Sequence, residues 1–159
     1  MRIVTAFIAV ALLGSAPLDD SLAQRRGKVV PPRVTVAILE ALPSPSGETR
    51  FLVALLFDNM STEPLKIKSL EFKLRLANQG ILDGKAGAMV VEALDQQTLV
   101  VEVRSEIISS VSRLLSFAEG PDNTLAYELF GKLTMERYRN DPLQFGGEGR
   151  APLVIPSQR

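Results

Sequence analysis

Two neighbouring segments, residues 51–57 and 65–76, carry the apolar pattern that most constrains the fold of this chain. In the first segment, large apolar residues occupy every second position and would share one face of a β-strand: Phe51, Val53, Leu55 and Phe57. The positions between them are also apolar: Leu52, Ala54 and Leu56. A strand with two apolar faces is typical of a sheet that is covered on both sides. We therefore expect residues 51–57 to form a central strand.

The second segment alternates in the same way but changes phase along its length. Its later part places apolar residues on one side and charged residues on the other: Leu70, Phe72, Leu74 and Leu76 against Glu71, Lys73 and Arg75. Leu65 and Ile67 stand in the opposite phase, which a β-bulge near Lys68 and Ser69 would produce. The residues between the two segments favour a turn, so the strands should meet at a polar corner. This phase predicts that Phe72 and Leu55 are buried and that Lys73 faces solvent.

Further strands are expected on either side of these two segments. Alternation of apolar and polar residues predicts them at residues 33–42, 89–94, 99–103, 123–135 and, as a last edge strand, 143–155. Glycines at 146–149 interrupt the last strand, and its prolines suit an edge. Residues 81–87 are too rich in glycine for regular structure. Gly131, inside a predicted strand, marks a bulge or a close approach of backbone.

One segment changes period. Its apolar residues follow the spacing of one helical face: Ile107, Ile108, Val111, Leu114 and Leu115. Gly120 and Pro121 follow as a stop signal, so we expect a short amphipathic helix over residues 105–117.

About seven short strands with one helix are typical of an all-β, antiparallel β-sandwich of immunoglobulin or fibronectin-III type. We assign this sandwich to residues 33–155.

The start of the chain matches the pattern of an export signal. Met1 and Arg2 form a short positive start, and the apolar run that follows, residues 3–13, is too short to span a membrane. Small residues before Gln24 predict cleavage there. Residues 1–23 would then be a cleaved signal peptide, 24–32 a basic, flexible leader and 156–159 a tail. The alternative is a buried helix that stays on the protein. With no cysteine for a lipid anchor, we expect a periplasmic or secreted protein without a transmembrane span after cleavage.

The composition excludes several classes of function. The chain has 18 basic residues (Lys and Arg together) and 18 acidic residues (Asp and Glu together). The resulting net charge of zero argues against nucleic acid as a partner. The chain contains neither cysteine nor histidine, which removes disulfides, thiolates, imidazole ligands and histidine-dependent triads. We therefore expect no catalytic residue, no cofactor and no metal site. A hydrolase would have to rely on Ser, Asp, Glu and Lys alone.

Two pairs of carboxylates are the nearest candidates for acid–base chemistry: Asp58 with Glu63, and Asp83 with Asp95. Such chemistry requires both groups at a working distance from a substrate. Nothing in the sequence holds either pair in such a position, so we interpret all four as solvated turn residues.

The order of features resembles the WHy domain (water stress and hypersensitive response), which is shared with type 2 late-embryogenesis-abundant proteins. Four positions carry the resemblance within residues 32–154: Asn59 at the polar corner, Gly84 after the second strand, and Tyr127 and Gly131 in the late strand. Three more fit the closing segment: Leu143, Phe145 and Gly149. Met60 and Ser61 stand where the family has Pro and a second Asn. The resemblance implies a fibronectin-like β-sandwich, no known catalytic residues and protection under desiccation, freezing or osmotic stress, here in a bacterial exported form.

The four positions also have expected structural roles. The Asn59 amide should cap the turn that it begins. Gly84 and Gly131 are interpreted as positions of special backbone geometry. The Tyr127 hydroxyl should form a hydrogen bond across the sandwich, as a tyrosine corner does. Asn59-Met60-Ser61 also spells a glycosylation acceptor, which we interpret as chance.

Three functional classes remain open. The first is a non-enzymatic protein that protects envelope proteins or membranes through weak surface contacts. The second is an envelope binding or assembly module that captures a partner along a sheet edge, next to the broken last strand. The third is a carrier of an apolar ligand held between the sheets. The expected partner is thus an envelope protein or a membrane surface, and the sequence does not identify it.

Overall fold

Eight β-strands and one short helix form the part of the chain that this computed structural model describes, residues 30–43, 48–105, 111–137 and 141–156. In chain order the elements are β1 (Arg33–Leu42), β2 (Thr49–Asp58), β3 (Leu65–Leu76), β4 (Gly80–Ala86), β5 (Met89–Val91), β6 (Gln96–Ser105), α1 (Val111–Leu115), β7 (Thr124–Met135) and β8 (Leu143–Val154). The predicted signal peptide and most of the predicted leader and tail lie outside the described residues.

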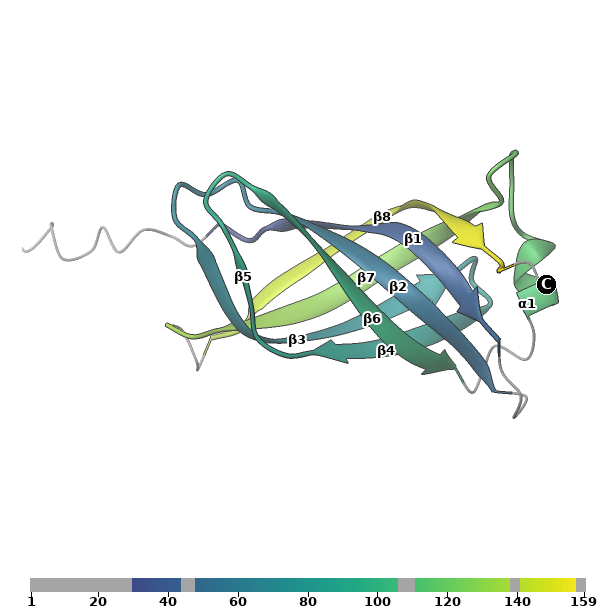
Figure 1. Ribbon diagram of the computed structural model, residues 1–159, viewed down its shortest axis with the longest axis horizontal. Helices are drawn as coiled ribbons and strands as arrows, with labels where there is room; N and C mark the ends of the chain where they lie inside the picture. Colours follow the sequence, from purple (N-terminus) through teal and green to yellow (C-terminus); the bar gives the residue numbers. More distant parts are fainter. Residues whose placement is uncertain (1–29, 44–47, 106–110, 138–140, 157–159) are drawn as a thin grey trace, which may run out of the picture.

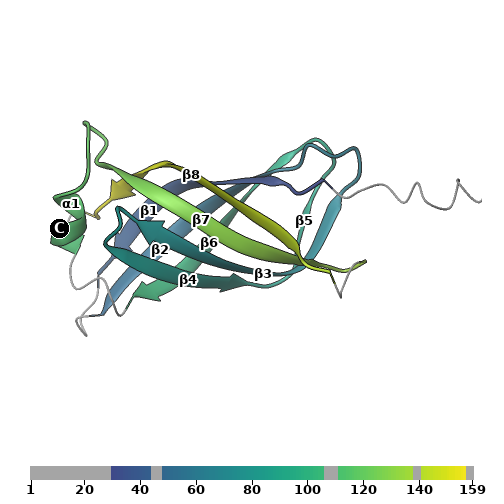
Figure 2. The ribbon, with the colours of Figure 1, turned by 180° about the vertical axis from the view of Figure 1, so that it is seen from behind.

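One path of strand pairing connects the strands in the order β4-β3-β7-β8-β1-β2-β6, with β5 paired to β3. The two end strands, β4 and β6, approach each other, so the sheet curls into a nearly closed, barrel-like shape (Figure 1). Two walls face each other: β1, β2 and β6 form the first wall, in front in Figure 1, and β3, β4, β7 and β8 form the second wall, in front in Figure 2. The structure confirms the all-β class. It does not confirm an immunoglobulin- or fibronectin-type sandwich, because hydrogen-bonded pairs join both walls.

The join between the walls is a short parallel pairing of β1 and β8, in which Leu39 lies opposite Leu153 and Glu40 opposite Val154. The other strand pairs are antiparallel. β8 therefore lies between β7 and β1, and the prediction of an edge strand is wrong. Its glycines do not interrupt it, since pairing with β7 is continuous from Leu143 to Pro152.

The space between the walls is filled by the inward side chains of the strands. Phe72 is 3% exposed and Leu55 is fully buried, whereas Lys73 faces solvent, which confirms the predicted strand phase. The pairing of β3 with β7 shifts register between Ile67 and Ser69, which confirms the predicted bulge.

Glycines in the second wall make room for aromatic rings. Successive register partners across β4, β3, β7 and β8 are Gly84, Phe72, Gly131 and Phe145. A Cβ atom on Gly84 would overlap the Phe72 ring, and one on Gly131 would overlap the Phe145 ring. Neither glycine has a positive φ, so the reason for glycine is space for a ring and not special backbone geometry. The pairing of Gly131 is continuous on both sides, so of the two features expected there, a bulge or a close approach of backbone, the bulge is absent.

The glycine-rich segment after β3 is regular as well. β4 (Gly80–Ala86) covers most of residues 81–87, where the sequence predicted irregular structure. A tight turn precedes it, with Ala77 and Asn78 in the left-handed region (φ 44° and 56°). Pairing with β3 continues as far as Ala86, because the ring of Phe72 covers Gly84 and supplies the contact that this residue lacks.

The helix is shorter than the sequence predicted. α1 spans Val111–Leu115, and Ser105, the expected first helical residue, ends β6. Residues 106–110 lie outside the described part of the chain. Leu114 is fully buried, and Val111 and Leu115 are partly buried against the core, so these three side chains hold the helix at the end of the sheet (Figure 1).

Replacing Phe72 by Ala should lower the free energy of unfolding by about 3–5 kcal/mol, the range for loss of a core aromatic ring. Replacing its neighbour Lys73 by Ala should change it by less than about 1 kcal/mol, because the ion pair of Lys73 with Asp83 is exposed. Urea unfolding of both variants measures the difference. Equal losses would contradict the observed orientation of β3.

Candidate functional site: the outer face of β1, β2 and β6

The outer surface of the second wall is a lattice of charges. Lys73 lies 3.6 Å from Asp83 and Arg75 lies 2.7 Å from Glu128. Glu71 contacts Lys132 at 2.9 Å and Lys85 at 3.5 Å. The hydrogen bond from Lys132, reinforced by the positive charges of Lys132 and Lys85, lowers the pKa of Glu71 below its ordinary value. These side chains alternate in sign across the strands, so most of this wall is charged and solvated, although Phe130 of β7, between Lys73 and Gly146, is 53% exposed.

The outer surface of the first wall is apolar at its centre. We call it the apolar outer face and define it by six residues: Ile38, Leu52, Ala54, Leu56 and Val100 of this wall, with Val154 of β8, which lies opposite Glu40 of β1. One row crosses three strands, because Ala54 of β2 lies opposite Ile38 of β1 and Val100 of β6. Ile38 is 44% and Val100 57% exposed. An antiparallel sheet with one face on the core normally turns polar residues outward, so this row departs from the usual pattern.

The prediction for β2 is thus half right. β2 is central, since it pairs with β1 on one side and β6 on the other. It is not covered on both faces, because Leu52, Ala54 and Leu56 are only partly buried, shielded by their neighbours within the sheet. Sequence reasoning saw these apolar positions but assigned them to a second buried face.

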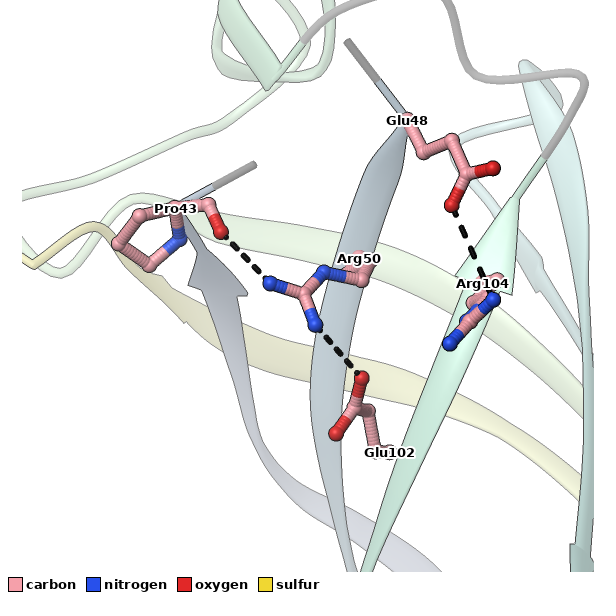
Figure 3. Close-up of polar contacts among 5 residues, drawn as sticks. All are labelled: Pro43, Glu48, Arg50, Glu102 and Arg104. Carbon is pink, nitrogen blue, oxygen red and sulfur yellow. Dashed lines mark hydrogen bonds and ion pairs between the residues drawn. The ribbon is translucent and has the colours of Figure 1, made fainter. Parts of the chain in front are cut away.

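Charged residues border the apolar outer face at the end where β2 begins (Figure 3). Arg50 donates to Oε1 of Glu102 at 3.1 Å and to the carbonyl oxygen of Pro43 at 2.9 Å. Arg104, the register partner of Arg50, lies 3.9 Å from Glu48. At the other end, Arg33, Asp58 and Gln96 form one row. The apolar strip therefore lies between two polar borders.

Asn59 fixes the corner where β2 ends. It is 1% exposed, and its Nδ2 donates to the carbonyl oxygens of Glu63 and Glu92 at 2.9 Å and of Val91 at 3.3 Å. Its Oδ1 accepts from the backbone N–H of Ser61 at 3.0 Å. The amide therefore caps its own turn, as expected, and also ties that turn to the segment before β6. A glycan on this buried nitrogen is incompatible with these bonds.

Tyr127 connects the two walls. Its hydroxyl accepts a hydrogen bond of 3.1 Å from the backbone N–H of Val36 on β1, beside the register shift between Val36 and Ile38. A Cβ atom on Gly149 would lie 2.7 Å from this hydroxyl, so the ring passes beneath a third glycine. The structure thus gives Asn59, Gly84, Tyr127 and Gly131 supporting roles, at the corner and in the core, and does not gather them into one site.

The predicted carboxylate pairs have separate structural roles. Asp83 is paired with Lys73 on the second wall. Asp95 accepts from the backbone N–H of Gln96 through its carboxylate and from that of Asn59 through its carbonyl oxygen. Within the described residues, no group of three or more potential metal-ligating side chains occurs. In the same part of the chain, no helix is long and apolar enough to cross a membrane.

A depression of about 370 Å³ lies on the second wall, near the turn between β3 and β4. Its charged lining residues are Arg75, Glu128, Glu148 and Arg150. Arg75 is bound to Glu128, and Arg150 is bound to Glu119 and the Thr124 carbonyl oxygen. The arginines are therefore satisfied within the chain, and the apolar outer face is the stronger candidate for an interaction surface.

Replacing Asn59 by Ala should destabilise the protein by about 1–3 kcal/mol, because buried backbone groups of the corner lose their partner. Asn59→Asp should lower the stability at least as much. A negatively charged carboxylate oxygen would then replace the Nδ2 group that donates to the three carbonyl oxygens. Denaturant unfolding measures both, with Met60→Ala, a change at an exposed neighbour, as control. A loss for Asn59→Ala no larger than that of the control would contradict the structural role.

Comparison with known proteins shows similarity at the level of fold. The sequence matches no protein-family model and no curated protein. Among solved structures, AT1g01470 from Arabidopsis thaliana matches with a TM-score of 0.56 and 16% identity, over 82% of this chain and 87% of that one. At2g46140.1, described as a candidate late embryogenesis abundant (LEA) protein, matches with a TM-score of 0.43 and 17% identity, over 83% and 78% of the two chains. The second score is too low to support an argument. The first shows that this chain is similar in fold to AT1g01470.

Proposed function

We propose that this protein is a non-enzymatic, exported stress-response protein that protects envelope proteins or membranes during desiccation, freezing or osmotic stress. The observation that carries the proposal is the apolar outer face, which leaves Ile38 and Val100 about half exposed. The sequence resemblance to the WHy domain and the similarity in fold to AT1g01470 support it.

The physical argument starts from what loss of water does to other proteins. As water is removed, partly unfolded proteins expose apolar segments that associate with one another. A folded sheet with a narrow apolar strip can cover such segments weakly, because burial of apolar surface is non-directional and needs no matching sequence. The charged borders around Arg50 and Asp58 keep the strip narrow, and narrow strips are far less prone to uncontrolled aggregation than broad patches.

The alternative of capture along a sheet edge has lost the observation that favoured it. That alternative rested on β8 as a broken edge strand, and β8 is paired to β7 on one side and to β1 on the other. The end strands of the sheet are instead β4 and β6. We favour surface contact through the apolar outer face, because its exposed residues are a direct observation.

Export predicts a defined N-terminus. Protein recovered from the envelope should begin at Gln24, because the apolar run and the small residues before that position match the cleavage pattern. Intact-mass measurement of the recovered protein tests this. Retention of residues 1–23 would show that the segment is not a cleaved signal.

Protection itself is tested with a labile enzyme that is frozen or dried with the protein at a modest molar excess. The native protein should preserve more enzyme activity than an unrelated β-protein of similar size and charge. Val100→Lys, which places a charge on the apolar outer face, should reduce this protection. Gln144→Lys is the matched control, since it adds the same charge at an exposed position of β8 outside this face.

Two results would count against the proposed mechanism. Equal protection by the unrelated protein would show that any added protein suffices. Equal protection by Val100→Lys and Gln144→Lys would show that the apolar outer face is not involved.

A further inference from the structure

The outward side chains of β2 form a pattern that reverses in charge about its centre. In order along the strand they are Arg50, Leu52, Ala54, Leu56 and Asp58, alternating with the buried residues. A cation stands at one end and an anion at the other, with two leucines placed symmetrically about Ala54. Such a strand is complementary to a second copy of itself that runs in the opposite direction.

A two-fold axis through Ala54, in the plane of contact and perpendicular to β2, brings these complementary groups together. Arg50 then lies over Asp58 of the second copy, and Leu52 lies over Leu56 of the second copy. Both contacts occur twice, because a two-fold interface repeats every pair. The small side chain of Ala54 faces its own counterpart at the axis, and the larger side chains beside it have to fill the space of about 10 Å between sheets packed face to face.

The neighbouring strands fit the same arrangement. On β6, Val100 lies over its own counterpart, and the register positions of β2 and β6 place Glu102 over Thr98 and Arg104 over Gln96 of the second copy. On β1, Ile38 meets its counterpart, Glu40 lies over Thr35, and Leu42 lies over Arg33. None of these positions opposes like charges. An axis parallel to the strands would instead place Arg50 over Arg50 and Asp58 over Asp58.

The charged groups at the two ends are available for this contact. Arg50 uses one nitrogen for Glu102 and another for Pro43, and a guanidinium has further N–H groups to donate. Within the described residues, Asp58 takes part in none of the ion pairs. The aligned packing of two sheets turns them by about 30°. The turn displaces the row of Ile38, Ala54 and Val100 least and the ends of β2 most, where the long side chain of Arg50 has to reach sideways to Asp58 of the second copy.

We propose that the apolar outer face binds a second copy of this chain, in an antiparallel, two-fold symmetric dimer centred on Ala54. The face measures about 30 Å along three strands that together span about 15 Å, or roughly 450 Å² for each copy. This is below the roughly 800 Å² per partner of a stable complex, so the dimer is weak and depends on concentration. The inference concerns the same face as the proposed function but does not require it, since self-association is measured without any client.

Sedimentation velocity of the purified protein, with its N-terminus defined by the mass measurement, tests the dimer across a concentration series. Asp58→Arg and Arg50→Asp should each raise the dimer dissociation constant about tenfold, because attraction becomes repulsion at two symmetric positions. The double variant Arg50→Asp/Asp58→Arg restores the complementarity with opposite signs, so its dissociation constant should return to within about threefold of the native value. Ala54→Arg should abolish the dimer.

Lys73→Asp and Asp83→Arg are the matched controls, since they reverse the same charges in an exposed pair on the second wall and should leave the dimer unchanged. A thermal melt establishes that every variant is folded. A monomer at all concentrations up to about 1 mM overturns the proposal, and so does a dimer that survives Ala54→Arg. Failure of the folded double variant to recover association overturns it too. One combined result would assign the apolar outer face to clients. The native protein would be a monomer, and its Ala54→Arg variant would no longer protect the client enzyme, which overturns the proposal that a second copy occupies the face.

Discussion

The packing of aromatic rings over glycines in the second wall is the constraint on which the rest of the structure depends. Phe72 lies over Gly84 and Phe145 over Gly131, so large rings fit inside a sheet that curls back on itself. The Phe145 ring reaches the first wall, where it meets Phe57 edge-on with ring centroids 6.4 Å apart. Tyr127 completes the connection through its hydrogen bond to Val36. The position of β1 and β2, and hence of the apolar outer face, follows from these contacts.

The sequence predicts those parts of the fold that depend on local periodicity. The phase of β3, the bulge after Ile67 and the burial of Phe72 follow from alternation alone. The capping role of Asn59 follows equally from residue type. Each of these features is determined by residues close together in the chain, so the reasoning needs no knowledge of which strands are neighbours.

The errors arise where a residue's environment comes from a distant strand. Glycine disfavours a strand when considered alone, so residues 81–87 were predicted to be irregular and β8 to be broken. In the structure, rings from adjacent strands cover Gly84 and Gly149, and both strands are continuous. The environment of Leu52 and Leu56 on β2 is equally hidden from local sequence. Their apolar pattern is the same whether a second layer of this chain or a second copy covers them. Only the pairing of the strands, and not the composition of each segment, shows which environment these residues have.

The two walls also show how the proposed self-association and the proposed protection would be combined in one protein. Charges on the second wall keep that side solvated, while the first wall concentrates apolar surface between Arg50 and Asp58. A weak dimer would cover this surface, and each monomer released would expose it to clients, so dimer and client compete for the same residues. Loss of water raises the concentration of this protein and of its clients together. Because dimerisation needs two copies of one chain whereas clients are many, mass action favours clients when they are in excess. A small, weak interface therefore suits this role better than a large one, which would keep the apolar outer face covered when clients need it.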